Sequence, residues 1–91
     1  MTRWHNEAAI RQTMSEMRCD RRTAKTLLFV ETMEDRARSM TWEPNWRFEC
    51  RNGDEVRSFG CAESAGRWLR GILDRGQARN PRVQFIGARR P

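Results

Sequence analysis

Several residue types that mark common functional classes are scarce or missing in this sequence. It has no tyrosine, one histidine (His5) and one lysine, and it carries no motif for nucleotide binding or hydrolysis. Catalysis needs convergent reactive groups, and a lone histidine near a terminus has no orienting partner. Three cysteines at uneven spacing, without a CxxC pair, predict neither a disulfide framework nor a zinc site. We therefore expect no enzyme activity, no metal and no cofactor.

Long hydrophobic runs are missing as well. No apolar stretch approaches the roughly 20 residues that span a bilayer, and the N-terminus lacks the apolar region of a secretory signal. An odd number of cysteines is typical of a reducing compartment. The sequence therefore predicts a cytoplasmic protein without membrane contact. Its 91 residues fit a single compact domain, and four tryptophans, four phenylalanines and five methionines supply a core.

Glycine and proline, the strongest helix breakers, are absent from the first 43 residues. Apolar residues recur there at helical spacing, which predicts one helix over 3–18 and a second that starts at Asp20 or Thr23 as its cap. A competing interpretation makes Leu27–Val30 part of a strand, because β-branched and aromatic residues gather there. We favour the helix because no turn residues flank that segment. The methionines and leucines of this half suit a homodimer interface as well as an internal core.

Turn residues divide the second half into shorter elements. Alternating apolar and charged residues predict strands over 46–51 and 55–59, joined as a hairpin, and helical periodicity predicts a third helix over 62–75. A last strand over 82–86 follows Asn80-Pro81. Two glycines inside the third helix, Gly66 and Gly71, suggest that another backbone packs closely against it.

The hairpin register has two interpretations. A two-residue turn at Asn52-Gly53 pairs Phe48 with Arg57, whereas a three-residue loop pairs Glu49 with Arg57. We favour the three-residue loop because it places unlike charges on one face of the hairpin.

The order of these elements predicts an α+β fold, with two N-terminal helices, a β-hairpin, a helix, and a final strand that joins a small antiparallel sheet. We expect the helices to cover one face of that sheet. Residues 1–91 then form one domain, made of a helical half (1–40), a hairpin-helix-strand half (45–87) and a basic tail (88–91).

The positive charge has an unusual composition and position. Seventeen of the eighteen basic residues are arginine, which favours bidentate contacts with phosphates, although coding bias also enriches arginine. Residues 45–91 hold ten basic and five acidic side chains, so this half is expected to meet nucleic acid or an acidic partner. The ten candidate contacts are Arg47, Arg51, Arg57, Arg67, Arg70, Arg75, Arg79, Arg82, Arg89 and Arg90.

On the predicted hairpin, arginines alternate with the aromatic residues Trp46, Phe48 and Phe59. Such a ribbon offers guanidinium groups to phosphates or bases, and aromatic rings to unstacked bases. The alternative interpretation is that the rings belong to the core and that the arginines are solvated.

The stretch from Trp46 to Arg75 resembles the hairpin and helix of the arm-binding N-terminal domains of tyrosine integrases. The residues that carry the likeness are Trp46-Arg47-Phe48, Gly53, Phe59, Ala62, Ala65, Trp68 and Leu69. That family reads DNA through a three-stranded sheet, so the resemblance implies DNA binding through the sheet. The third strand here would be Arg82–Ile86 or Leu27–Val30.

Size and composition are also similar to those of small phage or plasmid accessory proteins, the anti-CRISPR proteins among them, which inhibit a host complex by docking on it. That resemblance implies a nucleic-acid-handling protein complex as the partner. Trp4, Trp42 and Trp46 would then be interface anchors, because tryptophan is enriched among residues that dominate binding energy. The sequence thus predicts a nucleic-acid-binding module, with an inhibitor of a host complex as the alternative.

Overall fold

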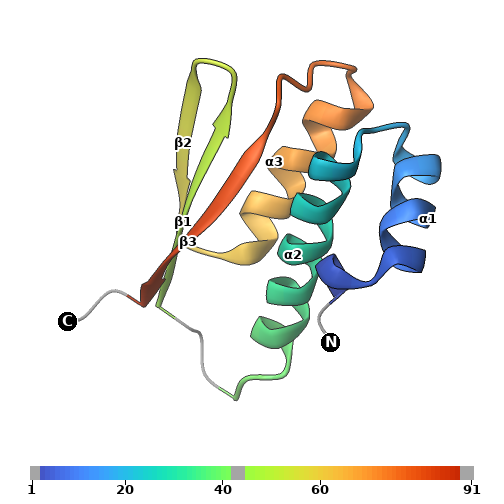
Figure 1. The fold of residues 1–91 in the computed structure, drawn as a ribbon. Helices are drawn as coiled ribbons and strands as arrows, with labels where there is room; N and C mark the ends of the chain where they lie inside the picture. Colours follow the sequence, from blue (N-terminus) through green and yellow to red (C-terminus); the bar gives the residue numbers. More distant parts are fainter. Residues whose placement is uncertain (1–2, 42–44, 89–91) are drawn as a thin grey trace.

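Figure 1 shows the fold in a computed structural model that describes residues 3–41 and 45–88. Its elements are the 3-10 turn η1 (Arg3–His5), α1 (Glu7–Met17), α2 (Arg21–Arg38), β1 (Trp46–Asn52), β2 (Glu55–Phe59), α3 (Ala62–Asp74) and β3 (Arg82–Ala88). This order confirms the predicted α+β arrangement. The segment 27–30 lies inside α2, so its interpretation as a strand is wrong.

Local capping sets where the helices begin. The Asn6 side chain accepts a hydrogen bond from the Ala9 N–H at 3.2 Å, so α1 starts at Glu7 and the predicted start at residue 3 is wrong. The Asp20 carboxylate accepts from the Thr23 N–H at 2.8 Å, which makes Asp20 the cap of α2. Both caps satisfy backbone donors that a helix start leaves unpaired.

The third helix ends at a glycine in the left-handed region. Gly76 has φ +64°, its N–H donates to the Leu73 carbonyl, and the Gln77 N–H donates to the Ile72 carbonyl. This pair of bonds is the Schellman motif, which turns the chain sharply toward β3.

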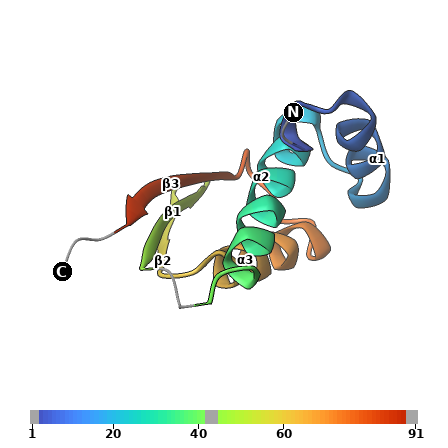
Figure 2. The same ribbon diagram turned by 90° about the horizontal axis from the view of Figure 1, so that it is seen from below.

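The sheet has the order β2-β1-β3 with antiparallel neighbours, so β1 is central and β2 and β3 are edges. Figure 2 shows α2 and α3 on one side of this sheet. Phe48 and Cys50 of β1 are fully buried on that side, in a cluster with Met33 of α2 and Ala62 and Ala65 of α3. The third strand is therefore the C-terminal segment, one of the two candidates from the sequence.

The apolar stripes of the N-terminal helices are used inside the chain. Ile10 of α1 forms a buried cluster with Ala24 and Leu28 of α2. On another side of α2, Leu27 and Val30 pack against Leu69 of α3. Helix α2 thus lies between α1 and the rest of the molecule (Figure 1).

The hairpin register differs from both predicted alternatives. Cys50 lies opposite Arg57, and Asn52 lies opposite Glu55, so the two-residue turn consists of Gly53 and Asp54. Gly53 has φ +61°, as the first central position of a type II′ turn requires. Asn52 belongs to the strand instead of the turn.

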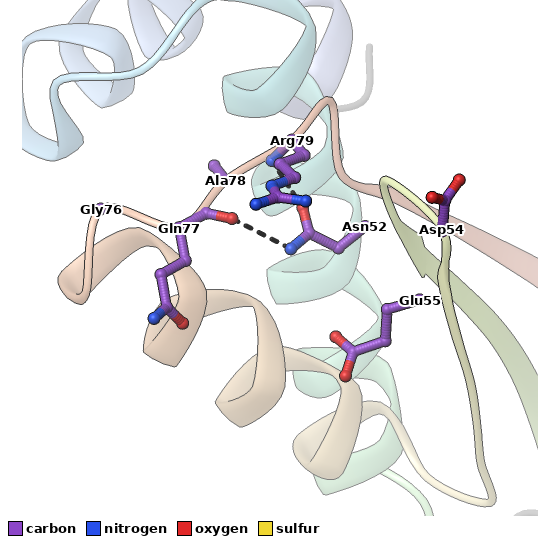
Figure 3. Close-up of a pocket in the computed structure, with 7 residues that line it drawn as sticks. All are labelled: Asn52, Asp54, Glu55, Gly76, Gln77, Ala78 and Arg79. Carbon is purple, nitrogen blue, oxygen red and sulfur yellow. Dashed lines mark hydrogen bonds between the residues drawn. The ribbon is translucent and has the colours of Figure 1, made fainter.

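The side chain of Asn52 explains this shift. Its Nδ2 donates to the Gln77 carbonyl at 3.0 Å, and its Oδ1 accepts from the Arg79 N–H at 2.6 Å. The neighbouring Gly53 N–H donates to the Arg79 carbonyl at 2.9 Å. Figure 3 shows Asn52 in this position, where it ties the end of β1 to the loop that joins α3 to β3.

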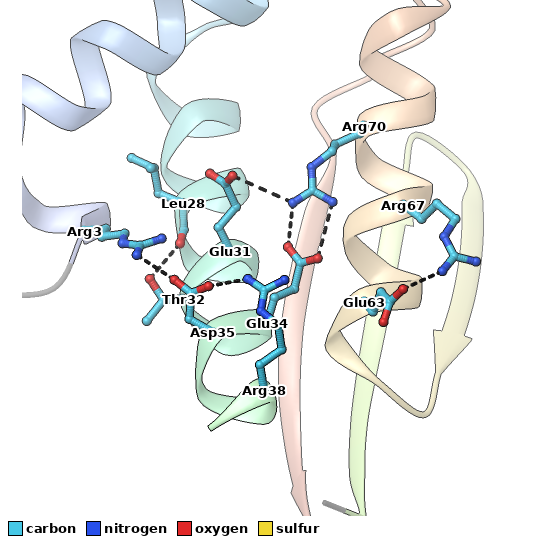
Figure 4. Close-up of polar contacts among 10 residues, drawn as sticks. All are labelled: Arg3, Leu28, Glu31, Thr32, Glu34, Asp35, Arg38, Glu63, Arg67 and Arg70. Atoms are coloured by element: carbon cyan, nitrogen blue, oxygen red, sulfur yellow. Dashed lines mark hydrogen bonds and ion pairs between the residues drawn. The ribbon is translucent and has the colours of Figure 1, made fainter. Parts of the chain in front are cut away.

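An ion pair between a buried carboxylate and a partly exposed guanidinium joins α2 to α3. Arg70 donates to both carboxylate oxygens of Glu34, at 2.6 and 3.4 Å, and the Glu34 side chain is only 8% exposed. A second carboxylate, on Glu31, lies 3.8 Å from the same guanidinium (Figure 4). These contacts raise the pKa of Arg70, the Glu34 hydrogen bond most of all.

Gly66 of α3 makes room for this pair. A Cβ atom there would lie 2.9 Å from Nη1 of Arg70 and 3.0 Å from the Glu34 carboxylate. A Cβ on Gly71 would likewise meet the guanidinium of Arg75, at 3.0 Å. The prediction that another backbone packs against these glycines is therefore wrong, because arginine and glutamate side chains occupy the space.

Candidate nucleic-acid interface

One face of the sheet is covered by none of the helices within residues 3–41 and 45–88, and we call it the open face (Figure 2). Because side chains alternate along a strand, residues that neighbour the buried Phe48 and Cys50 in β1 point to the opposite side. The register then adds their partners on the flanking strands. The open face consists of Arg47, Glu49 and Arg51 of β1, Val56 and Ser58 of β2, and Arg82 and Gln84 of β3.

Positive charge dominates this face. Arg51 lies directly opposite Arg82, an arrangement of like charges that destabilises a sheet. Glu49 is the one acid among these residues, and its Oε1 accepts from Arg51 Nε at 3.1 Å and from Nη2 at 3.0 Å. Within residues 3–41 and 45–88, neither Arg47 nor Arg82 forms an ion pair.

A hollow of about 550 Å³ borders the open face where β3 meets the start of α2. Arg22 of α2 lines it together with Arg51, Arg82, Glu49 and Gln84. The sequence interpretation missed Arg22, because it belongs to the half of the chain with almost balanced charge. The i,i+4 partner Thr26, which lines the same hollow, gives no signal in the sequence.

Four other candidate arginines are engaged elsewhere. Arg57 pairs with Glu55 at 3.1 Å, Arg67 pairs with Glu63 at 2.8 Å, and Arg70 belongs to the buried pair described above. Arg75 donates to the Gln77 side chain at 3.0 Å. These contacts stabilise local structure or solvated surface, and they do not bring the four guanidinium groups together with those of the open face.

Three further candidates fall into different groups. The backbone of Arg79 binds Asn52, and its side-chain carbons lie over Gly53. Arg89 and Arg90 lie outside the described residues. Of the ten arginines predicted from the sequence, the structure thus places Arg47, Arg51 and Arg82 on one continuous surface.

The aromatic candidates lie away from the open face. The Trp46 ring makes edge contacts with Phe48 and Phe85, at centroid distances of 6.2 and 5.7 Å. Trp4 is half-buried and meets the Phe29 ring edge-on at 5.0 Å. Trp42 lies outside the described residues. The rings of the hairpin therefore belong to the core, as the alternative interpretation held.

The reactive side chains are not arranged around a common site. Cys50 is fully buried, and burial raises the pKa of its thiol to about 11, so it is protonated at neutral pH. His5 is exposed beside Trp4. In the part of the chain that the structure describes, no group of three histidine, cysteine or acidic side chains is placed to hold a metal ion.

None of the helices between residues 3 and 41 or 45 and 88 has both the length and the hydropathy needed to cross a membrane. Comparisons of the chain with protein-family models, with curated proteins and with solved structures find no match. The resemblance to the integrase domains therefore stays a prediction from the residues alone, and the function has to be argued from the chemistry of the open face.

Proposed function

We propose that this protein binds nucleic acid through its open face, with Arg47, Arg51 and Arg82 in contact with backbone phosphates. The observation that carries the proposal is the concentration of these three guanidinium groups, with a single carboxylate, on the one sheet face that no helix covers. Guanidinium groups bind phosphate oxygens bidentately, and neutralised phosphates release counterions, which drives association.

The proposed contacts are to phosphates rather than to unstacked bases. None of the residues on the open face is aromatic, whereas proteins that grip single strands stack successive bases on aromatic rings. Duplex DNA carries the higher charge density, about one charge per 1.7 Å of axis. We therefore expect tighter binding to a duplex than to a single strand, with little dependence on sequence.

Fluorescence anisotropy with labelled duplex DNA, single-stranded DNA and RNA at several salt concentrations tests this proposal. Arg51→Ala and Arg82→Ala should each lower the slope of log K against log salt by about one, because each removes one phosphate contact. Arg67→Ala is the matched control, since it removes the same charge from an exposed pair on α3. Absence of binding near 0.15 M salt, where non-specific complexes have Kd values of about 10⁻⁴ to 10⁻⁶ M, would refute the proposal.

Docking on a protein complex is the second candidate function, and exposed apolar side chains on the outer strands favour it. Val56 of β2 and Phe85 and Ile86 of β3 are 53%, 38% and 53% exposed. Large apolar side chains at a surface are typical of contact sites when they are contiguous. The neutral substitutions Val56→Ser and Ile86→Ser would then abolish capture of the partner, and because they change no charge they should leave any nucleic-acid affinity nearly intact.

A further inference from the structure

We infer that the hollow between the start of α2 and the open face is a phosphate-binding site, in which Arg22, Arg51 and Arg82 hold one phosphate group. The inference rests on the proposed function, because it names the place where a backbone phosphate would be held most firmly. It also brings in Arg22, a residue from the helical half of the chain.

The position of Arg22 is unfavourable for the helix itself. It lies in the first turn of α2, a turn that contains no acidic residue. The N-terminal end of a helix carries a partial positive charge, so a cation there is destabilising; the carboxylate of the cap residue Asp20 lies near enough to attract Arg22, without forming an ion pair with it. Its neighbour Arg21 is paired with Glu7 of α1, whereas Arg22 has no ion pair within residues 3–41 and 45–88.

The two strand residues in the hollow are placed equally unfavourably. Arg51 and Arg82 are direct cross-strand partners, so their charges repel each other. Glu49 lines the same hollow and is bound by Arg51. Three guanidinium groups against one carboxylate leave a net charge of about +2 around the hollow, so a backbone phosphodiester with its single negative charge lowers the repulsion and a phosphate dianion removes it.

Residues whose placement lowers the stability of their own helix or strand cluster at functional sites, because ligand binding compensates for the lost stability. Two independent placements of this kind, one at the start of a helix and one across a strand pair, converge here on a single hollow of about 550 Å³. The amide of Gln84, which also lines the hollow, adds a neutral donor. Each guanidinium presents several N–H donors in a planar fork, which matches the oxygens of a phosphate.

Titration with inorganic phosphate, followed by NMR of backbone amides and arginine side-chain Nε–H groups, tests the site directly. We expect saturable shifts at Arg22, Arg51 and Arg82 that exceed those caused by sodium chloride at equal ionic strength. Arg22→Gln should weaken phosphate binding about tenfold, as expected for the loss of a charge-assisted hydrogen bond. Shifts equal to those in sodium chloride would overturn the inference.

Arg36→Gln is the matched control. Arg36 is exposed and lies in the last turn of the same helix, about 21 Å from Arg22 along the axis of α2. Its substitution by glutamine removes the same charge as Arg22→Gln. The site is supported if Arg22→Gln weakens phosphate binding and Arg36→Gln does not. Equal effects of the two substitutions would mean general electrostatic attraction and would overturn it.

Duplex DNA serves as the second probe and separates this inference from the proposed function. If duplex binding is strong and Arg22→Gln affects it no more than Arg36→Gln, the phosphate site is wrong and the open-face proposal stands. If phosphate occupies the hollow and no nucleic acid binds near 0.15 M salt, the site is right and the nucleic-acid function is wrong. The phosphate group would then belong to another phosphorylated molecule.

Discussion

At Arg82, the stability of the sheet and the proposed phosphate binding oppose each other. The side chain faces Arg51 across two strands and has no ion pair within the described residues. Arg82→Gln should therefore raise the free energy of unfolding by about 0.5 kcal/mol in the absence of ligand. Urea unfolding at low salt measures this gain, which should shrink as salt screens the repulsion. A loss of stability would show that Arg82 is a structural residue.

Asp20 gives the molecule a pH-dependent helix cap. Hydrogen bonds from the Thr23 hydroxyl and backbone N–H hold the pKa of its carboxyl below the ordinary value of 3.8. Because the folded-state pKa is lowered, this contribution to stability is present above about pH 4 and is lost as the pH falls through the folded-state pKa.

The substitution Asp20→Asn isolates that effect, since asparagine caps a helix without titrating. At pH 7 the wild type should be more stable by about 0.5 kcal/mol, because the carboxylate charge also favours the helix N-terminus. Thermal unfolding at a series of pH values should show this difference shrink once the pH falls through the folded-state pKa of Asp20. A difference that stays constant with pH would contradict the assignment.

On the scale of elements, Asn52 connects the hairpin to the loop after α3. Its side chain makes two hydrogen bonds to backbone groups of Gln77 and Arg79 and is 9% exposed. Asn52→Ala leaves those groups without a partner, so it should lower the free energy of unfolding by about 2 kcal/mol. Asp54→Ala, in the exposed turn next to it, is the control and should change stability by less than about 0.5 kcal/mol.

The Glu34–Arg70 pair connects α2 to α3 in a similar way. Arg70→Leu strands a carboxylate that is nearly buried, and we expect a loss of about 2 kcal/mol, reduced from the fully buried case because the Arg70 side chain is 38% exposed. The double variant Glu34→Leu with Arg70→Leu should recover most of that loss. Nucleic-acid affinity should be nearly unchanged in the double variant, since Arg70 lies away from the open face.

The sequence predicted these elements well and their connections poorly. Periodicity and the capping residue Asp20 are local signals, and each placed a helix or its start within a few residues. The register of the hairpin was wrong because the partners of Asn52 lie 25 and 27 residues further along the chain. The same holds for Arg70, which is 36 residues from Glu34. No pattern within a short window contains such pairs.

For the whole molecule, we expect the helices to differ in the free energy of local unfolding, because they bury different numbers of residues. Helix α1 buries two residues, Ile10 and Thr13, whereas α2 buries seven. Regions with few buried contacts open at lower free energy than the core. Native-state hydrogen exchange should therefore show amides of α1 exchanging at least about tenfold faster than those in the centre of α2. Equal protection would mean that all helices unfold as one unit.

The candidate site shows the same limit of sequence reasoning at this scale. Counting charge by halves of the chain put Arg47, Arg51 and Arg82, which share the open face, among ten candidates, and it left out Arg22, which lines the adjoining hollow. Only the packing of α2 beside β3 brings that residue to the hollow. Which side chains meet on the surface depends on which helices and strands pack side by side. That packing is determined by residues throughout the chain and not by any short segment.

The outer side of β2 is a sheet edge to which a strand from another chain could add at high protein concentration. No strand covers this side within the described part of the chain, and a bare sheet edge is a template for fibre growth. Glu55 and Arg57 stand on the same face of that edge, paired with each other and exposed. An added strand would have to satisfy both charges or strip them of water, so we expect these two side chains to disfavour the addition of apolar segments from other chains at this edge.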